Sequence, residues 1–364
     1  MTKRIINFNA GPAGLPLEAL EQVQGELLNY NDSGISIMEA SHRGKDYDAV
    51  HAEAQALFKK LFGIPDDFKV LFLQGGASTQ FAMVPMNFLG EDQSADYINT
   101  GAWSKKAIKE AKLFGKVNVV WTGEEQNFGA LPKVSELKLD PNARYCHLTT
   151  NNTIFGTQFT EFPKTGGVPL VCDMSSDIMS RPIDWTDIGM VYAGAQKNLG
   201  PSGLTVVALR ESFYNQRATE GVPTMLSYGT HWEKDSLFNT PPTFAIYIFK
   251  KVLEWVESLG GLAGIEKRNQ EKADLLYDAI DGSGEYYRGT VADPASRSWM
   301  NVTFRLPSED LEQKFIADGL AAGFIGLKGH RSAGGIRVSM YNAVSPDQIR
   351  KFVAFMDEFK RANA

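Results

Sequence analysis

The segment between Val168 and Gly203 constrains the fold more than any other stretch of this 364-residue chain. An apolar run, Val168 to Cys172, ends at the acid Asp173. A second apolar run, Met190 to Ala195, is followed two residues later by Lys197. Short apolar runs of this kind are typical of buried parallel strands, and ligands of open α/β sheets lie beyond the carboxyl ends of such strands. The sequence therefore predicts that Asp173 and Lys197 leave two strands toward one crevice.

A buried lysine and a buried carboxylate in one crevice are the two groups that pyridoxal phosphate chemistry requires. A desolvated lysine can form a Schiff base with an aldehyde, and a carboxylate beside the pyridine nitrogen keeps the ring protonated so that it accepts electrons. A lysine at a strand end, taken alone, more often only reaches water. The turns Ala193-Gly194-Ala195 and Gly200-Pro201-Ser202-Gly203 favour the cofactor interpretation, because they let another group approach Lys197 closely.

Residues 168–203 resemble the cofactor-lysine region of the class V pyridoxal-phosphate-dependent aminotransferases. The stretches DMSSD, SRPID, YAGAQKN and GPSG are most similar to the members of that family that act on phosphoserine, and the similarity extends from Asn7 to the C-terminal helix. The resemblance implies the α/β fold of type I pyridoxal-phosphate transferases. We expect a large cofactor-binding domain over 16–260 with a mixed, mostly parallel seven-stranded sheet. A smaller α+β domain would comprise 1–15 and 261–364.

The resemblance also implies roles for individual residues. Lys197 would hold pyridoxal 5′-phosphate covalently and carry the proton in catalysis, and Asp173 would keep the ring cationic. Trp103 would stack on the ring, and Thr153 would bond its phenolic oxygen. The residues implied for the cofactor phosphate are Ala77, Ser78, Gln196, Asn239 and Thr240, of which Asn239 and Thr240 would come from a partner subunit. No metal site is expected.

The residues themselves leave other interpretations of these positions open. The Gly75-Gly76 turn between a strand and a helix either binds an anion through free N–H groups or is an ordinary capped turn. Trp103, where a loop becomes a helix, is more often part of a core than a ring stack. Thr153 also fits a hydrogen-bonded turn after a strand.

Spacing of apolar residues and turn residues predicts the remaining elements. Strands are predicted over 69–74, 95–99, 117–121, 144–150, 204–210, 300–306 and 335–340. Helices are predicted over 17–28, 48–62, 80–89, 104–114, 243–259, 262–280, 308–322 and 345–360, and loops over 41–44, 226–229 and 236–242.

Two His-Arg pairs in glycine-bearing loops, His42-Arg43 and His330-Arg331, indicate an anion site in an otherwise acidic protein, because arginine binds phosphate or carboxylate with two hydrogen bonds. Each pair alone is more often simply solvated. The resemblance implies that both pairs bind the distal phosphate or carboxylate of the substrate, and that Arg337 binds its α-carboxylate. Which subunit supplies each pair does not follow from the sequence.

Charge and cysteine content limit the partners and the compartment. A net charge of −6 argues against nucleic acid and anionic membranes as partners. Cys146 and Cys172 lie in apolar runs, which favours buried reduced thiols and a cytoplasmic location. The N-terminus has no long apolar segment typical of a signal peptide. By resemblance we expect small-molecule substrates and a homodimer with shared active sites.

The expected reaction transfers the amino group of L-glutamate to 3-phosphohydroxypyruvate and yields O-phospho-L-serine and 2-oxoglutarate. Whether the phosphorylated hydroxythreonine of vitamin B6 biosynthesis is also a substrate stays open. One alternative is another class V reaction, either alanine–glyoxylate transamination or desulfuration, although a desulfurase needs a mobile cysteine. The other alternative is a non-catalytic binding protein that keeps the fold, and the intact set of Asp173, Lys197 and Arg337 argues against it.

Overall fold

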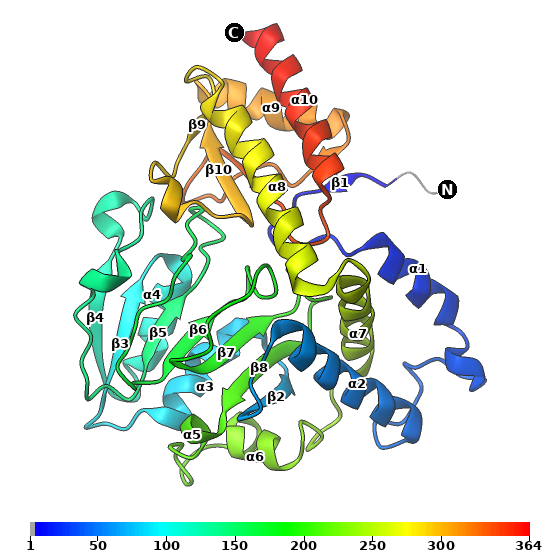
Figure 1. The fold of residues 1–364 in the computed structure, drawn as a ribbon, viewed down its shortest axis with the longest axis vertical. Coiled ribbons are helices and arrows are strands. Elements are labelled where there is room, and N and C mark those ends of the chain that lie inside the picture. The colour runs from blue at the N-terminus through cyan, green and yellow to red at the C-terminus, as the bar shows by residue number, and fades with distance from the viewer. Residues whose placement is uncertain (1–3) are drawn as a thin grey trace.

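A seven-stranded sheet forms the centre of the computed structural model, which describes residues 4–364 (Figure 1). The strand order is β2-β8-β7-β6-β5-β3-β4, and β8 alone runs antiparallel to its neighbours. The strands are β2 (Phe68–Leu73), β3 (Ser94–Asn99), β4 (Lys116–Thr122), β5 (Cys146–Thr149), β6 (Leu170–Asp173), β7 (Ile188–Gly194) and β8 (Thr205–Arg210). The predicted mixed, mostly parallel sheet is therefore confirmed.

Helices cover both faces of this sheet. They are α2 (Lys45–Phe62), α3 (Gly76–Phe88), α4 (Ala102–Ala111), α5 (Glu211–Tyr214), α6 (Tyr228–Glu233) and α7 (Thr243–Ser258), and α1 (Leu17–Glu26) packs on α7. Neighbouring strand residues point to opposite faces, so Phe72 and Cys172 join a core with α2 and α7, whereas Leu71 and Val171 join a second core with α3 to α6. Burial on both faces explains why the central strands are continuous apolar runs.

A smaller α+β unit lies beyond the sheet, at the upper end of the view in Figure 1. Its elements are α8 (Gly261–Asp281), β9 (Arg288–Gly289), β10 (Asn301–Arg305), α9 (Glu309–Ala321), β11 (Phe324–Ile325), β12 (Ile336–Ser339) and α10 (Pro346–Asn363). Strands β12, β10 and β9 form an antiparallel sheet, and the N-terminal β1 (Ile6–Asn7) pairs in parallel with β11.

A third hydrophobic core fills this smaller unit and includes Phe8 from the N-terminal segment. Helix α8 contributes to two cores, because Leu262 and Ile265 pack with the large sheet whereas Leu276 and Ile280 pack in the third core. The division of the chain at residues 15 and 260 stays a prediction, and α8 is the element that connects the two units.

Several predicted boundaries are wrong. Helix α2 begins at Lys45 instead of 48, α3 begins at Gly76 instead of 80, and α4 spans 102–111 instead of 104–114. Residues 228–233 form α6, although a loop was predicted through 229. Gly, Ser and Thr in the first turn of α3 are weak helix formers, and packing against the sheet overrides that weak preference there.

Candidate active site

A cavity of about 420 Å³ lies at the carboxyl ends of the parallel strands. Residues that follow β2, β3, β5, β6 and β7 converge on it, which is where ligands of open α/β sheets bind. Nine of the predicted site residues line the cavity: Ala77, Ser78, Trp103, Thr153, Asp173, Gln196, Lys197, His330 and Arg337. The fold thus brings together residues that are up to 260 positions apart in the chain, from Ala77 to Arg337.

Lys197 follows β7 and reaches into this cavity. Its Nζ donates a hydrogen bond to Thr153 Oγ1 at 2.6 Å and lies 5.7 Å from the centre of the Trp103 ring. The pKa of Lys197 is lowered to about 8, chiefly by burial and also by Arg337, while the nearby Asp173 opposes the shift. Part of the amine is therefore neutral near physiological pH, which a nucleophile or a base requires.

Asp173 ends β6 and is 3% exposed. Its Oδ1 accepts hydrogen bonds from the backbone N–H of Ser175 at 3.0 Å and from the Ser175 hydroxyl at 2.7 Å. Burial raises the pKa of Asp173, and the bonds from Ser175 and the charge of Lys197 counteract that rise. A cation placed against this carboxylate would offset the remaining cost of burying its charge.

The first turn of α3 presents backbone N–H groups to the same cavity. Gly75 precedes the helix with φ 90°, a left-handed conformation that favours glycine. A Cβ on Gly75 would also collide with the side chain of Thr79. Ala77 and Ser78 lie in this first turn, where N–H groups lack intrahelical partners and attract anions.

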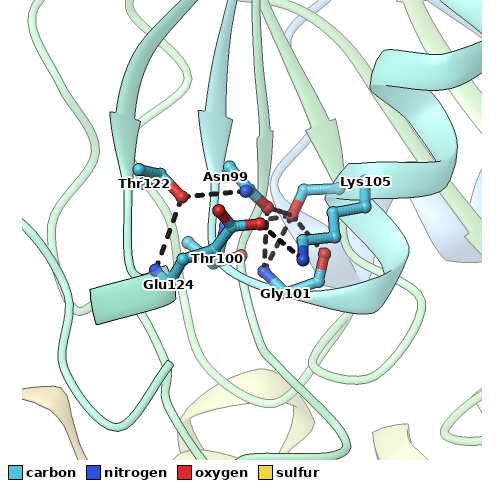
Figure 2. Close-up of polar contacts among 7 residues, drawn as sticks. Asn99, Thr100, Gly101, Lys105, Thr122 and Glu124 are labelled. Atoms are coloured by element: carbon cyan, nitrogen blue, oxygen red, sulfur yellow. Dashed lines mark hydrogen bonds and ion pairs between the residues drawn. The ribbon is translucent and has the colours of Figure 1, made fainter. Parts of the chain in front are cut away.

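Hydrogen bonds at the start of α4 hold the turn that precedes Trp103. The Ser104 hydroxyl accepts a hydrogen bond from the N–H of Gly101 at 2.9 Å, and Asn99 Nδ2 donates to Thr122 Oγ1 at 2.9 Å. Figure 2 shows how these contacts tie the ends of β3 and β4 to the turn before α4. Trp103 stands in the first turn of that helix, and its Nε1 is buried without a protein partner.

The smaller unit contributes Arg337 and His330. Arg337 lies on β12 and its Nη1 donates to the Thr153 carbonyl at 3.3 Å, while its Nε is buried without a partner. Burial first, and then Arg337 and Arg331, lower the pKa of His330. His330 Nδ1 lies 2.6 Å from Ser332 Oγ, which orients the ring at the edge of the cavity.

Five predicted residues do not line this cavity: His42, Arg43, Asn239, Thr240 and Arg331. Residues 42 and 43 lie in the turn before α2, and Arg331 is exposed next to His330. Asn239 lines a neighbouring cavity with Gly75 and Thr79, and the Thr240 carbonyl accepts a hydrogen bond from Gln74 Nε2 at 3.4 Å.

The structure adds residues that the site prediction missed. The N-terminal segment crosses Lys197: Ala13 N donates to the Gln196 carbonyl at 2.9 Å, and a Cβ on Gly11 would lie 3.3 Å from Lys197 Cγ. Gly11 has φ 137°, so the close approach and the backbone both favour glycine there. Ser175 and Ser176, directly after Asp173, also line the cavity. The sequence signals that could have indicated these residues were the Gly11-Pro12 pair and the small polar residues Ser175 and Ser176.

A second cavity and the two cysteines are less suited to catalysis than the cavity around Lys197. A larger cavity of about 670 Å³ between 134–137 and 160–188 contains none of the predicted site residues. Cys146 and Cys172 are free and buried, and burial raises the pKa of both thiols, which disfavours the reactive thiolate that a desulfurase needs. Within residues 4–364 no cluster of His, Cys, Asp and Glu could hold a metal ion, and no helix is both long and apolar enough to cross a membrane.

Comparisons with known proteins agree with this geometry. The family model described as aminotransferase class-V matches residues 5–352. The phosphoserine aminotransferase of Niallia circulans is 57% identical over 362 residues, which cover 100% of this chain and 99% of that protein. The phosphoserine aminotransferase of Desulfosudis oleivorans is 55% identical over 365 residues, with 100% of both chains covered.

Solved structures give the same result. The phosphoserine aminotransferase from Bacillus circulans subsp. alkalophilus has a TM-score of 0.97 at 56% identity, with 100% of both chains covered. The PLP-bound phosphoserine aminotransferase from Trichomonas vaginalis has a TM-score of 0.92 at 38% identity, and the match covers 97% of this chain and 100% of that one.

Proposed function

This chain belongs to the class-V aminotransferase family, and we propose that it transfers the amino group of L-glutamate to 3-phosphohydroxypyruvate, giving O-phospho-L-serine and 2-oxoglutarate. One observation carries the proposal: the partly buried Lys197 and the buried carboxylate of Asp173 line one cavity with Trp103 at the strand ends. Relatives that are aligned over 98–100% of the chain at 51–57% identity are phosphoserine aminotransferases, which supports this choice of substrate.

The residues around the cavity fit pyridoxal 5′-phosphate. Asp173 would face the protonated ring nitrogen, and the Trp103 ring would lie against the cofactor. The first turn of α3, with Ala77 and Ser78, would bind its phosphate through backbone N–H groups. When bound, the cofactor withdraws electrons from the substrate Cα and so stabilises the carbanion formed there.

Lys197 performs the proton transfer in this proposal. Because burial lowers its pKa to about 8, the amine can accept the proton from the substrate Cα and later return it. Thr153 Oγ1 holds Lys197 Nζ at 2.6 Å, which keeps the amine inside the cavity. Asp173 supplies the fixed negative charge on the same side of the sheet.

The anionic groups of the substrate need separate binding sites. Arg337 is partly buried, lines the cavity and has an Nε without a partner, so we assign it the α-carboxylate that both amino acids share. His330 and the exposed Arg331 would bind the distal phosphate or carboxylate, together with His42 and Arg43. A dianionic phosphate depends more on this second group than a carboxylate does.

The test of this function is a screen of amino donors in single half-reactions. The enzyme loaded with pyridoxal phosphate should release 3-phosphohydroxypyruvate from phosphoserine and 2-oxoglutarate from glutamate, and it should react poorly with alanine. Chromatography of the released oxo acids measures each donor. A preference for alanine over phosphoserine would contradict both the anion sites and the proposed reaction.

Two arginine variants refine the same screen. Arg337→Ala should reduce turnover of phosphoserine and glutamate alike, by roughly 10- to 150-fold, because a charged hydrogen bond contributes about 1.5–3 kcal/mol. Arg331→Ala should reduce phosphoserine turnover more than glutamate turnover. Equal losses for both donors in Arg331→Ala would show that this arginine does not bind the distal group.

We also propose that the active enzyme is a symmetric homodimer with shared sites. Four predicted site residues do not line the cavity of their own chain, namely His42 and Arg43 in one loop and Asn239 and Thr240 in another. In addition, large apolar side chains are exposed at Leu17, Leu28, Ile35 and Met38, with Leu28 at 85%. Leu17 lies on α1, and the other three lie within 12 residues after its end. Helix α1 is at the outer edge of the molecule (Figure 1), and a second copy would cover these side chains.

Mixing two inactive variants tests the shared site. Lys197→Ala and Thr240→Ala should each lose activity, whereas a 1:1 mixture allowed to exchange subunits should recover about a quarter of the wild-type rate. Half of the dimers are then mixed, and each has one intact site of two. Sedimentation measurements check that each variant and the mixture form dimers. A fully active monomer, or mixed dimers without recovered activity, would contradict sharing.

The proposal includes a cytoplasmic location. Cys146 and Cys172 are both free and buried, a state that a reducing compartment maintains. Fractionation of cells that produce the protein would test the location, and recovery of the enzyme outside the cytoplasm would contradict it.

A further inference from the structure

The two groups that must act on one substrate stand on different sheets. Lys197 follows β7 of the seven-stranded sheet, whereas Arg337 lies on β12 of the three-stranded sheet. No strand pairing joins these two sheets among the described residues. The distance between the Lys197 amine and the Arg337 guanidinium therefore depends on the contacts at the junction between the sheets. These include backbone hydrogen bonds, such as the one from Ser298 N to the Gly156 carbonyl at 2.9 Å, as well as side-chain contacts.

Asn342 makes three hydrogen bonds at that junction. It follows β12 closely and is 2% exposed. Its backbone N–H donates to Asn198 Oδ1 at 3.0 Å, and its Nδ2 donates to the Met179 carbonyl at 2.9 Å. Its Oδ1 accepts from Asn269 Nδ2 on α8 at 2.9 Å. One residue thus connects the segment after Arg337 with the turn after Lys197, the loop after Asp173, and α8.

The residues that bond Asn342 make further hydrogen bonds of their own. Asn198 Nδ2 donates to the Ser176 carbonyl at 3.3 Å, and Asn269 Nδ2 also donates to the Ser180 carbonyl at 2.9 Å. Lys272 on α8 is fully buried, and its Nζ donates to the carbonyls of Met340 at 2.8 Å and Tyr341 at 2.9 Å. Burial first, and then Arg268, lower the pKa of Lys272 well below its usual value.

We propose that Asn342 is a positioning residue, which sets the location of Arg337 relative to Lys197 by joining β12 to the loops that follow β6 and β7. The side-chain and backbone donors named in this buried network all have acceptors, whereas Asn269 Oδ1 has no partner, and the paired donors rigidify the junction. Because Arg337 would bind the substrate carboxylate through charged hydrogen bonds, a displaced guanidinium would bind that carboxylate more weakly. The inference rests on the proposed function in one respect, because Arg337 must bind the substrate carboxylate.

The experiment compares Asn342→Ala with the wild type as loaded enzymes. Alanine removes the two side-chain bonds, to the Met179 carbonyl and from Asn269 Nδ2, and keeps the backbone N–H that donates to Asn198. We measure the dissociation constant of 2-oxoglutarate by calorimetry on the pyridoxal phosphate form, with which this oxo acid cannot exchange an amino group. The variant should bind about tenfold more weakly. In turnover of glutamate and of phosphoserine, the loss should appear mainly in KM, with kcat less affected. A crystal structure of the variant should show that the 3.3 Å contact between Arg337 and the Thr153 carbonyl is lost.

Asn87→Ala is the matched control. Asn87 is also buried, and it bonds the carbonyls of Met83 and Leu226 and the N–H of Tyr228, away from the cavity. It should lower the melting temperature comparably and leave 2-oxoglutarate binding unchanged. If Asn342→Ala does not fold, Asn269→Ala removes the bond from α8, and it should weaken binding about threefold.

The outcomes separate this inference from the proposed function. An unchanged dissociation constant in the folded Asn342→Ala variant, or in Asn269→Ala if only that variant folds, overturns the positioning role. So does a crystal structure of that variant with Arg337 in place. If the wild type itself does not bind 2-oxoglutarate, the proposed function fails, and the crystal structure alone then decides the inference.

Discussion

Lys197→Ala should lose transamination by about 10⁴-fold or more, while the protein still folds. The variant removes the only amine that we place on the proton-transfer path, and a positioned acid–base group contributes about 10²–10⁴-fold by itself. Because burial lowers the pKa of Lys197 to about 8, holding the charged amine in the fold costs free energy at neutral pH. Alanine removes that cost, so the melting temperature should fall by no more than a few degrees.

Borohydride reduction of the loaded enzyme followed by peptide mapping checks the assignment. The wild type should carry the cofactor label on Lys197, and the variant should carry none. Lys106 provides the control, because its amine lies 4.5 Å from the centre of the Trp103 ring, outside the set of residues that line the cavity. Lys106→Ala should keep the label on Lys197, and a label on Lys106 in the wild type would refute the assignment.

Asp173→Asn should keep the fold and the bound cofactor but slow transamination by roughly 10²- to 10⁴-fold. Asparagine retains an oxygen that can accept the two bonds from Ser175. It removes the negative charge, and breaking a buried ion pair costs about 3–5 kcal/mol, which corresponds to that loss of rate. The rate of 2-oxoglutarate release from glutamate in a single turnover measures the loss, and absorbance measures the cofactor content.

Asp177 supplies the control for this variant. It is another buried acid on the same loop, bonded to Thr150 Oγ1 at 2.5 Å and to Gln158 Nε2 at 3.2 Å, and it does not line the cavity. Burial raises the pKa of Asp177 to about 6, so a neutral side chain is tolerated there. Asp177→Asn should stay within about tenfold of the wild type. A similar rate for Asp173→Asn would exclude the ring-charge role.

The central part of the site was predictable because its residues follow strands that are visible in the sequence. The runs before Asp173 and Lys197 are apolar on both faces, which is the pattern of strands covered by helices on both sides. Once these strands are parallel neighbours, the side chains at their ends must meet. Trp103 and Thr153 were assigned by resemblance, and the structure places both against Lys197.

Contacts between distant segments were not predictable from local pattern. The Gly11-Pro12 pair signals a turn, but it does not indicate that Gly11 packs on Lys197, because that contact depends on the fold, in which β1 pairs with β11 and Ala13 bonds the Gln196 carbonyl. Likewise, Asn342 resembles any loop asparagine until the fold brings it to Asn198 and Asn269. The first turn of α3 was missed because glycine and serine signal a turn locally, and only the packed helix shows otherwise.

The parallel pairing of β1 with β11 also determines when the site can be completed during synthesis. Residues 6–7 leave the ribosome among the first, but their partners at 324–325 are made more than 300 residues later. At about 5–20 residues per second, that separation corresponds to a delay of roughly 15–60 seconds. The large sheet and the loop with Lys197 can form in that interval, whereas the strand that anchors Gly11 over the lysine still lacks its partner. The anchor that β11 gives to the N-terminal segment therefore forms only when translation is nearly finished.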